Sequence, residues 1–145
     1  MQTGVLLVAG GTGLVGRYVV EKACAEGRSV RVLTRSVATE SPHGPSVQRV
    51  QWRPGAAAAG DPEAVAEVSR AFDGVETVLN LAGTSIGDGR LGSAHLHRVL
   101  QSRLDAVAAL IAGCEGSDST PKQWLQTSAI GFYGDSGEES VDEQH

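Results

Sequence analysis

Residues 5–16 have the sequence VLLVAGGTGLVG, and this stretch decides the fold class. Its first five residues form an unbroken apolar run, which is typical of a strand covered on both faces. Gly10, Gly13 and Gly16 follow, and Leu14 begins a run with apolar residues at helical spacing. In a strand, glycine turn and helix in this order, backbone N–H groups and the positive end of the helix dipole point at one place. The stretch therefore predicts a dinucleotide-binding site.

The rest of the chain alternates strand patterns with helix patterns. We expect strands at 30–34, 47–52, 75–82 and 124–129, and helices at 14–26, 62–72 and 92–112. Between them, 36–46 is expected to be an exposed loop and 55–60 a linker of small residues. This alternation implies an α/β fold, a Rossmann-like parallel sheet of about five strands with helices on both faces. The pattern stops where another unit would follow, so we expect a truncated sheet.

Composition narrows the classes of function. The net charge is −5, from 12 basic and 17 acidic residues, and no basic cluster is present, which argues against a nucleic-acid partner. Cys24 and Cys114 have no metal or redox spacing, and we expect buried, reduced thiols. His95 and His97 lie two apart on a helix and face different directions, so we expect surface histidines and no metal site. No signal peptide or membrane-length apolar segment is evident, which favours the cytoplasm and no membrane partner.

The residues around the glycine turn discriminate between nucleotide sites. Arg17 and Tyr18 follow Gly16 where a P-loop needs lysine and a hydroxyl residue, so a P-loop is excluded. The second strand ends in Thr34-Arg35-Ser36, without the acid that usually binds the ribose 2′-hydroxyl of NAD. A guanidinium and hydroxyl groups suit a 2′-phosphate, which favours NADP. The alternative is that Arg35 is a solvated surface residue.

Three further places could carry chemistry. The fourth strand closes with small residues at 80–83, against which a cofactor can lie. On the long helix, Arg103 projects from an apolar stripe, where it either binds a cofactor phosphate or ribose from a buried position or extends to the sheet edge. The stripe consists of Leu96, Val99, Leu100, Val107 and Leu110. Thr127 and Ser128 end the fifth strand, and their hydroxyls could face a substrate, as could that of Tyr133.

Together these pieces resemble the extended short-chain dehydrogenase/reductase superfamily, in its epimerase-family branch of NAD-dependent epimerase/dehydratase-like proteins. The resemblance is carried by GGTGLVG (10–16), RVLTRS (31–36), NLAGTSIGDGR (80–90), QSR (101–103) and SAIGFYGDSGEE (128–139). It implies an NADP-dependent epimerase or oxidoreductase that transfers hydride at a hydroxyl-bearing carbon of a small molecule.

The resemblance also implies a role for individual residues. The pyrophosphate would be bound by Gly10, Thr12, Gly13, Leu14 and Val15, and the 2′-phosphate by Thr34 and Arg35. The path from adenosine to nicotinamide would be lined by Leu81, Ala82 and Gly83, with Arg103 in contact with the cofactor. Ser128 would match the active-site serine.

One element of the superfamily pattern is missing. Its Tyr-x-x-x-Lys pair normally lies some two dozen residues after the serine, whereas Tyr133 is followed by residues 134–137 without a lysine. We therefore expect residues 1–145 to be one dinucleotide-binding domain of an enzyme whose substrate-binding part is absent. The alternative is a non-catalytic module that senses NADP. Apolar surface left by missing strands would favour a homo-oligomer.

Overall fold

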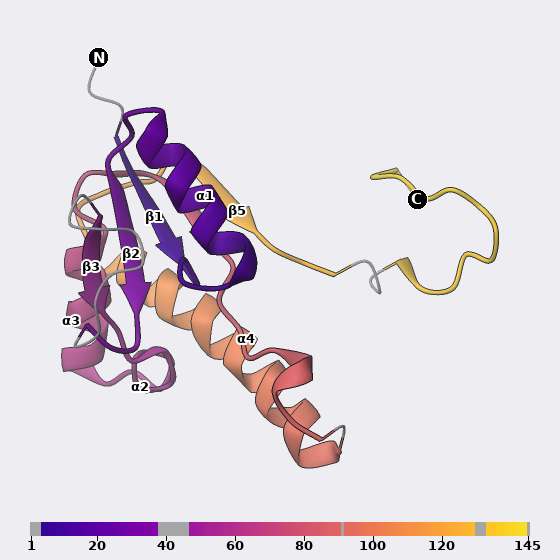
Figure 1. Ribbon diagram of the computed structural model, residues 1–145. Coiled ribbons are helices and arrows are strands. Elements are labelled where there is room, and N and C mark those ends of the chain that lie inside the picture. Colours follow the sequence, from indigo (N-terminus) through magenta and orange to yellow (C-terminus); the bar gives the residue numbers. More distant parts are fainter. Residues whose placement is uncertain (1–3, 38–46, 91, 130–132, 145) are drawn as a thin grey trace.

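The computed structural model describes residues 4–37, 47–90, 92–129 and 133–144. Its elements, drawn in Figure 1, are β1 (Val5–Ala9), α1 (Leu14–Ala25), β2 (Val30–Thr34), β3 (Gln48–Gln51), α2 (Pro54–Ala58), α3 (Pro62–Ala71), β4 (Val75–Asn80), the short 3₁₀ helix η1 (Ile86–Asp88), α4 (Ser93–Glu115) and β5 (Gln123–Gln126). Most of the loop expected at 36–46 lies outside the described residues.

The five strands form one sheet in the order β3-β2-β1-β4-β5, and every neighbouring pair is parallel. At the centre of the sheet, Val8 of β1 is paired with Val32 on one side and Leu79 on the other. The strand order reverses direction at β1, which is the arrangement of a Rossmann-like sheet. The predicted fold class is therefore confirmed.

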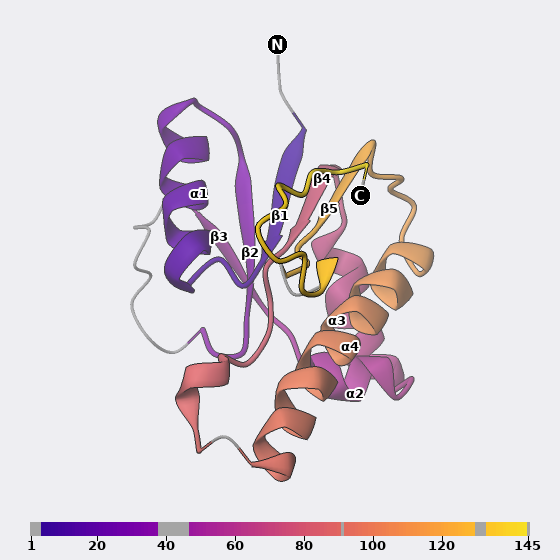
Figure 2. The same cartoon turned by 90° about the vertical axis from the view of Figure 1, so that its right-hand side faces the viewer.

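Helices cover both faces of the sheet (Figure 2): α1 lies on one face and α2, α3 and α4 on the other. Side chains of β1 alternate between the two layers, as strand geometry requires. Leu6 and Val8 pack with Val20 of α1 in one core cluster. Leu7 packs with Phe72 at the end of α3 in the other. Both clusters meet the same central strand, so the carboxyl end of β1 is held from two sides.

Helix α2 occupies the segment that the sequence predicts to be a linker. That prediction is wrong, because the small residues here are alanines, which have the highest helix propensity, and Pro54 suits the first helical position. Ala57 is buried in the core cluster beneath α3 and α4. Gly60, with φ +82°, then separates α2 from α3.

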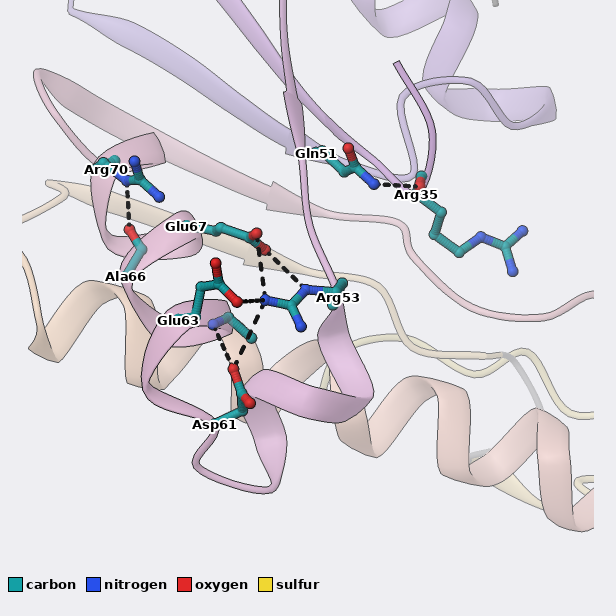
Figure 3. A network of polar contacts seen from close by, with 9 residues as sticks. Arg35, Gln51, Arg53, Asp61, Glu63, Ala66, Glu67 and Arg70 are labelled. Carbon is teal, nitrogen blue, oxygen red and sulfur yellow. Dashed lines mark hydrogen bonds and ion pairs between the residues drawn. The ribbon is translucent and has the colours of Figure 1, made fainter. Parts of the chain in front are cut away.

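A polar network fixes α2 to α3 (Figure 3). The Arg53 guanidinium, one residue before α2, lies 3.3 Å from a carboxylate oxygen of Glu63, 3.3 Å from one of Glu67 and 3.7 Å from one of Asp61. The hydrogen bond to Glu67 is the main cause of a raised pKa for Arg53. Asp61 also caps α3, as its sequence predicts, by accepting from Ala64 N at 2.8 Å. The pairs are exposed and contribute orientation more than stability.

Strands β4 and β5 are shorter than predicted. The Asn80 side chain accepts a hydrogen bond from Ala82 N at 3.0 Å, which turns the backbone out of β4. Thr127, just after β5, donates its hydroxyl to Asn80 O at 2.9 Å. Residues 81–83 and 127–129 therefore leave the sheet at its carboxyl edge and border the site described below.

Helix α4 buries a face that overlaps the predicted one only in part. Val99 and Leu110 are buried as expected, but Leu96 and Leu100 are about half exposed. The face against the core is completed by small residues, because Gly113 lets α4 approach Val68 too closely for any side chain. Large apolar residues are thus a poor guide to the buried face of this helix.

Two smaller expectations are also corrected. His95 is 4 % exposed, and its Nε2 atom lies 2.9 Å from the carbonyl oxygen of Ile86, so it fastens the η1 loop to α4 instead of facing solvent. Cys24 and Cys114 are half-buried, not buried, and partial burial raises the pKa of the Cys114 thiol. The described residues include no helix long and apolar enough to cross a membrane.

Candidate functional site

Two adjoining cavities lie at the carboxyl edge of the sheet. The first has a volume of about 820 Å³ and the second of about 580 Å³. They share Gly10, Gly13 and residues 81–83, so they form one groove across the ends of β1 and β4. In open parallel sheets this point, where the strand order reverses, is where ligands bind.

The glycine turn after β1 is shaped by close backbone contacts. Gly10 has φ +83°, and a β-carbon on it would lie 2.7 Å from the carbonyl carbon of Leu81. A β-carbon on Gly16 would overlap the carbonyl oxygen of Gly10. The turn is closed by a hydrogen bond from Gly13 N to Gly10 O at 3.1 Å. Only glycine permits this approach of α1 to the end of β1.

The N-terminus of α1 is left open toward the groove. Its N-cap residue is Gly13, which has no side chain to accept from the first-turn N–H groups, and these have no partner within the helix. The first turn holds no acidic residue. Leu14 and Val15 line the second cavity with largely exposed side chains. Amides without a partner in the helix, the helix dipole and the absence of acid in this turn fit the pyrophosphate of a dinucleotide.

The far end of the first cavity is cationic. Thr34, Arg35, Ser36 and Arg49 line it. Arg35 is fixed through its backbone, because Gln51 Nε2 donates to its carbonyl oxygen at 3.4 Å, and its guanidinium extends away from this contact (Figure 3). Arg49 Nη2 donates to Ser36 O at 2.6 Å. Two guanidiniums therefore border one end of the groove.

Arg103 reaches the second cavity from α4. Its side chain is exposed and lies over Gly83, whose missing β-carbon leaves the room that the guanidinium fills. Of the two alternatives for Arg103, the buried guanidinium is wrong, because the side chain is exposed, whereas extension to the sheet edge agrees with its position over Gly83 after β4. The cation is nevertheless beside the glycine turn, where Gly10 and Gly13 line the same cavity.

The hydroxyl groups after β5 differ in availability. Ser128 is exposed and lines the second cavity, as predicted for a residue facing a substrate. The Thr127 hydroxyl is engaged with Asn80 O, as described above. Tyr133 is half-buried and lines neither cavity, and residues 130–132 before it lie outside the described residues.

The structure brings all predicted cofactor residues to this one groove. They are Gly10, Thr12, Gly13, Leu14, Val15, Thr34, Arg35, Leu81, Ala82, Gly83 and Arg103. Their roles in binding remain predictions. In the described part of the chain, no three histidine, cysteine, aspartate or glutamate side chains lie where they could hold a metal ion together. The expectation of no metal site stays a prediction.

Several groove residues are missed by the sequence analysis. Trp52, just after β3, and Pro54 of α2 line the first cavity, and Ser102 and Asp105 line it from α4. Arg49 could have been found, because the strand predicted after β2 lies beside it and carries a long cationic side chain, which reaches Ser36 O after β2. Asp105 could not, since the helical pattern does not reveal which polar residues of α4 flank the groove.

The sequence matches the NAD dependent epimerase/dehydratase family over residues 6–145. The chain belongs to this family. Among curated relatives, the epimerase family protein YfhF of Bacillus subtilis is 30 % identical over 139 residues, covering 95 % of this chain and 42 % of YfhF. Epimerase family protein SSP1921 of Staphylococcus saprophyticus is 28 % identical over 127 residues, covering 88 % and 38 % of the two chains.

Solved structures of epimerases have the same fold. The human epimerase family protein SDR39U1, crystallised with NADPH, superposes with a TM-score of 0.65 at 27 % identity, covering 89 % of this chain and 38 % of that one. For UDP-N-acetylglucosamine 4-epimerase of Bacillus cereus the TM-score is 0.69 at 20 % identity, covering 99 % and 41 %, a likeness of fold alone. This chain thus spans about two fifths of the length of these relatives.

Proposed function

We propose that this member of the epimerase/dehydratase family is the NADP(H)-binding part of an epimerase or reductase-type enzyme. The observation that carries the proposal is the groove itself. It has the open N-terminus of α1 at its middle and the guanidiniums of Arg35 and Arg49 at one end. The other end leads to Arg103 and Ser128. This layout matches a molecule with a central pyrophosphate and a second phosphate on one side.

Each part of the groove has a task in this proposal. The first-turn amides of α1 bind the pyrophosphate, and Arg35, Arg49 and the Thr34 hydroxyl bind the 2′-phosphate. The backbone at 81–83 lines the path between the two halves of the ligand, and Arg103 adds a positive charge over it. A nicotinamide held in the groove would supply hydride transfer at a carbon that bears a hydroxyl group. Ser128 donates a hydrogen bond that orients the oxygen on that carbon.

NADP is favoured over NAD by the charges at the cationic end. A ribose 2′-hydroxyl is usually bound by an acid at the end of the second strand, and here this position holds Arg35. A 2′-phosphate beside two guanidiniums gains charge-assisted hydrogen bonds, which are the strong ones. The human relative crystallised with NADPH supports the same choice.

Titration of the full chain with NADPH and with NADH, followed by nicotinamide fluorescence, tests the proposal. We expect NADPH to bind tighter by about tenfold to a hundredfold, as one or two charged hydrogen bonds allow. Arg35→Ala should bring the two affinities together. Arg70→Ala is the matched control, because Arg70 lies on α3 outside both cavities and donates to Ala66 O. Equal affinities in the unaltered chain, or binding of neither nucleotide, would overturn the proposal.

A second candidate is a module that binds NADP without turnover. It agrees with a groove in which Tyr133 has no part, because Tyr133 lines neither cavity. Tight binding of NADPH combined with hydride transfer to a carbonyl substrate would exclude it. The small-molecule substrate and a homo-oligomer remain predictions.

A further inference from the structure

We infer that the carboxylate of Asp105 recognises the 6-amino group of the adenine ring. The inference rests on the proposed function, since it assigns the base-reading residue of the same groove. It makes the site selective for adenine over purines that carry an oxygen at C6.

The first cavity is lined by side chains of opposite charge. Arg35, just after β2, and Arg49 of β3 contribute cations, and Asp105 of α4 and Asp88 of η1 contribute anions. The same cavity also has apolar lining residues, which are Leu33, Trp52, Pro54, Ala82 and Ala106. A phosphate suits the cationic wall, and an aromatic base attached to the same ribose suits the apolar part beside it. Such a base would then have Asp105 within the same cavity.

Asp105 is oriented by its neighbours on both sides. Its Oδ1 atom accepts a hydrogen bond from Gln101 Nε2 at 2.7 Å, one turn earlier on α4. Its Oδ2 atom lies 3.4 Å from the place of a β-carbon on Gly55, next to Pro54 of the cavity wall. Among the described residues no side chain or backbone group donates a hydrogen bond to Oδ2. One carboxylate oxygen is therefore fixed and the other keeps its acceptor capacity.

The chemistry of a carboxylate decides which base it accepts. An ionised carboxylate only accepts hydrogen bonds, and the adenine 6-amino group donates them. In hypoxanthine a carbonyl oxygen replaces that group, and two acceptors would then face each other. A site that uses a buried polar group to bind a donor strongly rejects an analogue lacking the donor. Because Asp105 is half-buried, the difference in affinity between the two bases is smaller than in a fully buried site, but adenine is still the preferred base.

Comparing NADPH with its deamino analogue, reduced nicotinamide hypoxanthine dinucleotide phosphate, tests the inference on the full chain. We expect NADPH to bind about tenfold tighter, the value of one hydrogen bond to a charged group. Asp105→Asn should abolish this preference, because an amide can also donate to the C6 oxygen. Asp88→Asn tests the other carboxylate of this cavity and should leave the preference unchanged. Glu115→Gln is the matched control, since Glu115 is an exposed carboxylate of α4 that lines neither cavity.

The outcomes separate the two proposals. If neither dinucleotide binds, the proposed function fails. If both bind the unaltered chain equally well, the role of Asp105 is overturned while the NADP site stands. The role of Asp105 would also be overturned if Asp88→Asn lost the preference for NADPH over the deamino analogue while Asp105→Asn kept it. Should Asp105→Asn fold poorly by circular dichroism, Asp105→Ala is measured in its place, and a retained preference there contradicts the inference.

Discussion

The guanidinium of Arg103 occupies the space that a β-carbon on Gly83 would fill. Gly83 follows β4 and Arg103 lies in the middle of α4, so the contact joins the end of the central sheet to the longest helix. It also fixes where the positive charge stands, over the second cavity and beside the glycine turn. A glycine of the groove thus determines the position of one of its cations.

Gly83→Ala is predicted to weaken NADPH binding by displacing Arg103. We expect a loss of about fivefold to tenfold, in the range of one perturbed hydrogen bond to a charged group. Arg103→Ala should cause a similar loss. The double variant should be little worse than either single one, because both changes remove the same interaction. Fluorescence titration of the four proteins measures this coupling.

Gly87→Ala is the control for the glycine substitution. A β-carbon there meets only Ser85 Oγ, at the ordinary contact distance of 3.6 Å, and affinity should not change. Fully additive losses in the double variant would show that Gly83 and Arg103 act independently and would contradict the prediction.

Arg31→Met is predicted to destabilise the fold without a specific effect on the groove. Arg31 is 9 % exposed, and burial lowers its pKa. Its guanidinium donates to Ala71 O at 2.6 Å and Asp73 O at 2.8 Å, and thereby joins β2 to the end of α3. Loss of these bonds leaves carbonyl groups unsatisfied, at a cost of about 2–4 kcal/mol in the free energy of unfolding.

Urea denaturation measures this change. The exposed Arg70→Met should stay within about 0.5 kcal/mol of the unaltered chain. An equally small effect of Arg31→Met would mean that the buried guanidinium is dispensable for folding.

Glu76 predicts a pH dependence of stability at the opposite edge of the sheet. The hydrogen bond from Lys122 Nζ at 2.7 Å is the main cause of its lowered pKa, followed by the bond from Gly4 N at 2.9 Å. A folded-state pKa below that of the unfolded chain stabilises the fold above the unfolded value, about 4.3 for glutamate. This contribution is lost as the pH falls through the lowered pKa of Glu76.

Glu76→Gln should therefore lower the melting temperature at pH 7 by a few degrees at most, because the pair is exposed. The difference from the unaltered chain should vanish in acid. Melting curves from pH 2.5 to 7 test this, with the exposed Glu21→Gln as control. A difference that persists at the lowest pH would show that it does not arise from ionised Glu76.

The central part of the fold could be predicted because each local pattern agrees with the tertiary structure. The apolar run of β1 is buried on both faces. The glycine turn needs glycine at Gly10 and Gly16, because a β-carbon at either position would meet backbone atoms. Asp61 and Pro62 begin α3 where capping chemistry places it. These local patterns predict most helix boundaries and the carboxyl edge of the sheet. They thereby also predict most of the residues that line the groove.

The segment of α2 carries local helix signals in its alanines and Pro54, and Ala57 is also buried in the core cluster shared with α3 and α4. Other parts could not be predicted because they depend on contacts distant in sequence. The buried face of α4 depends on small residues such as Gly113, which allow close packing against Val68. The periodicity of large apolar side chains does not reveal such a face. Asp105 reaches the groove only as a consequence of that choice.

The strand at the centre of the sheet separates two core clusters, one under α1 and one under α3 and α4. The groove lies at the carboxyl end of this strand. The glycine turn borders it on one side and α4 on the other. A ligand that spans the groove contacts both layers. Because it binds only the folded domain, its binding free energy adds to the free energy of unfolding of both layers together.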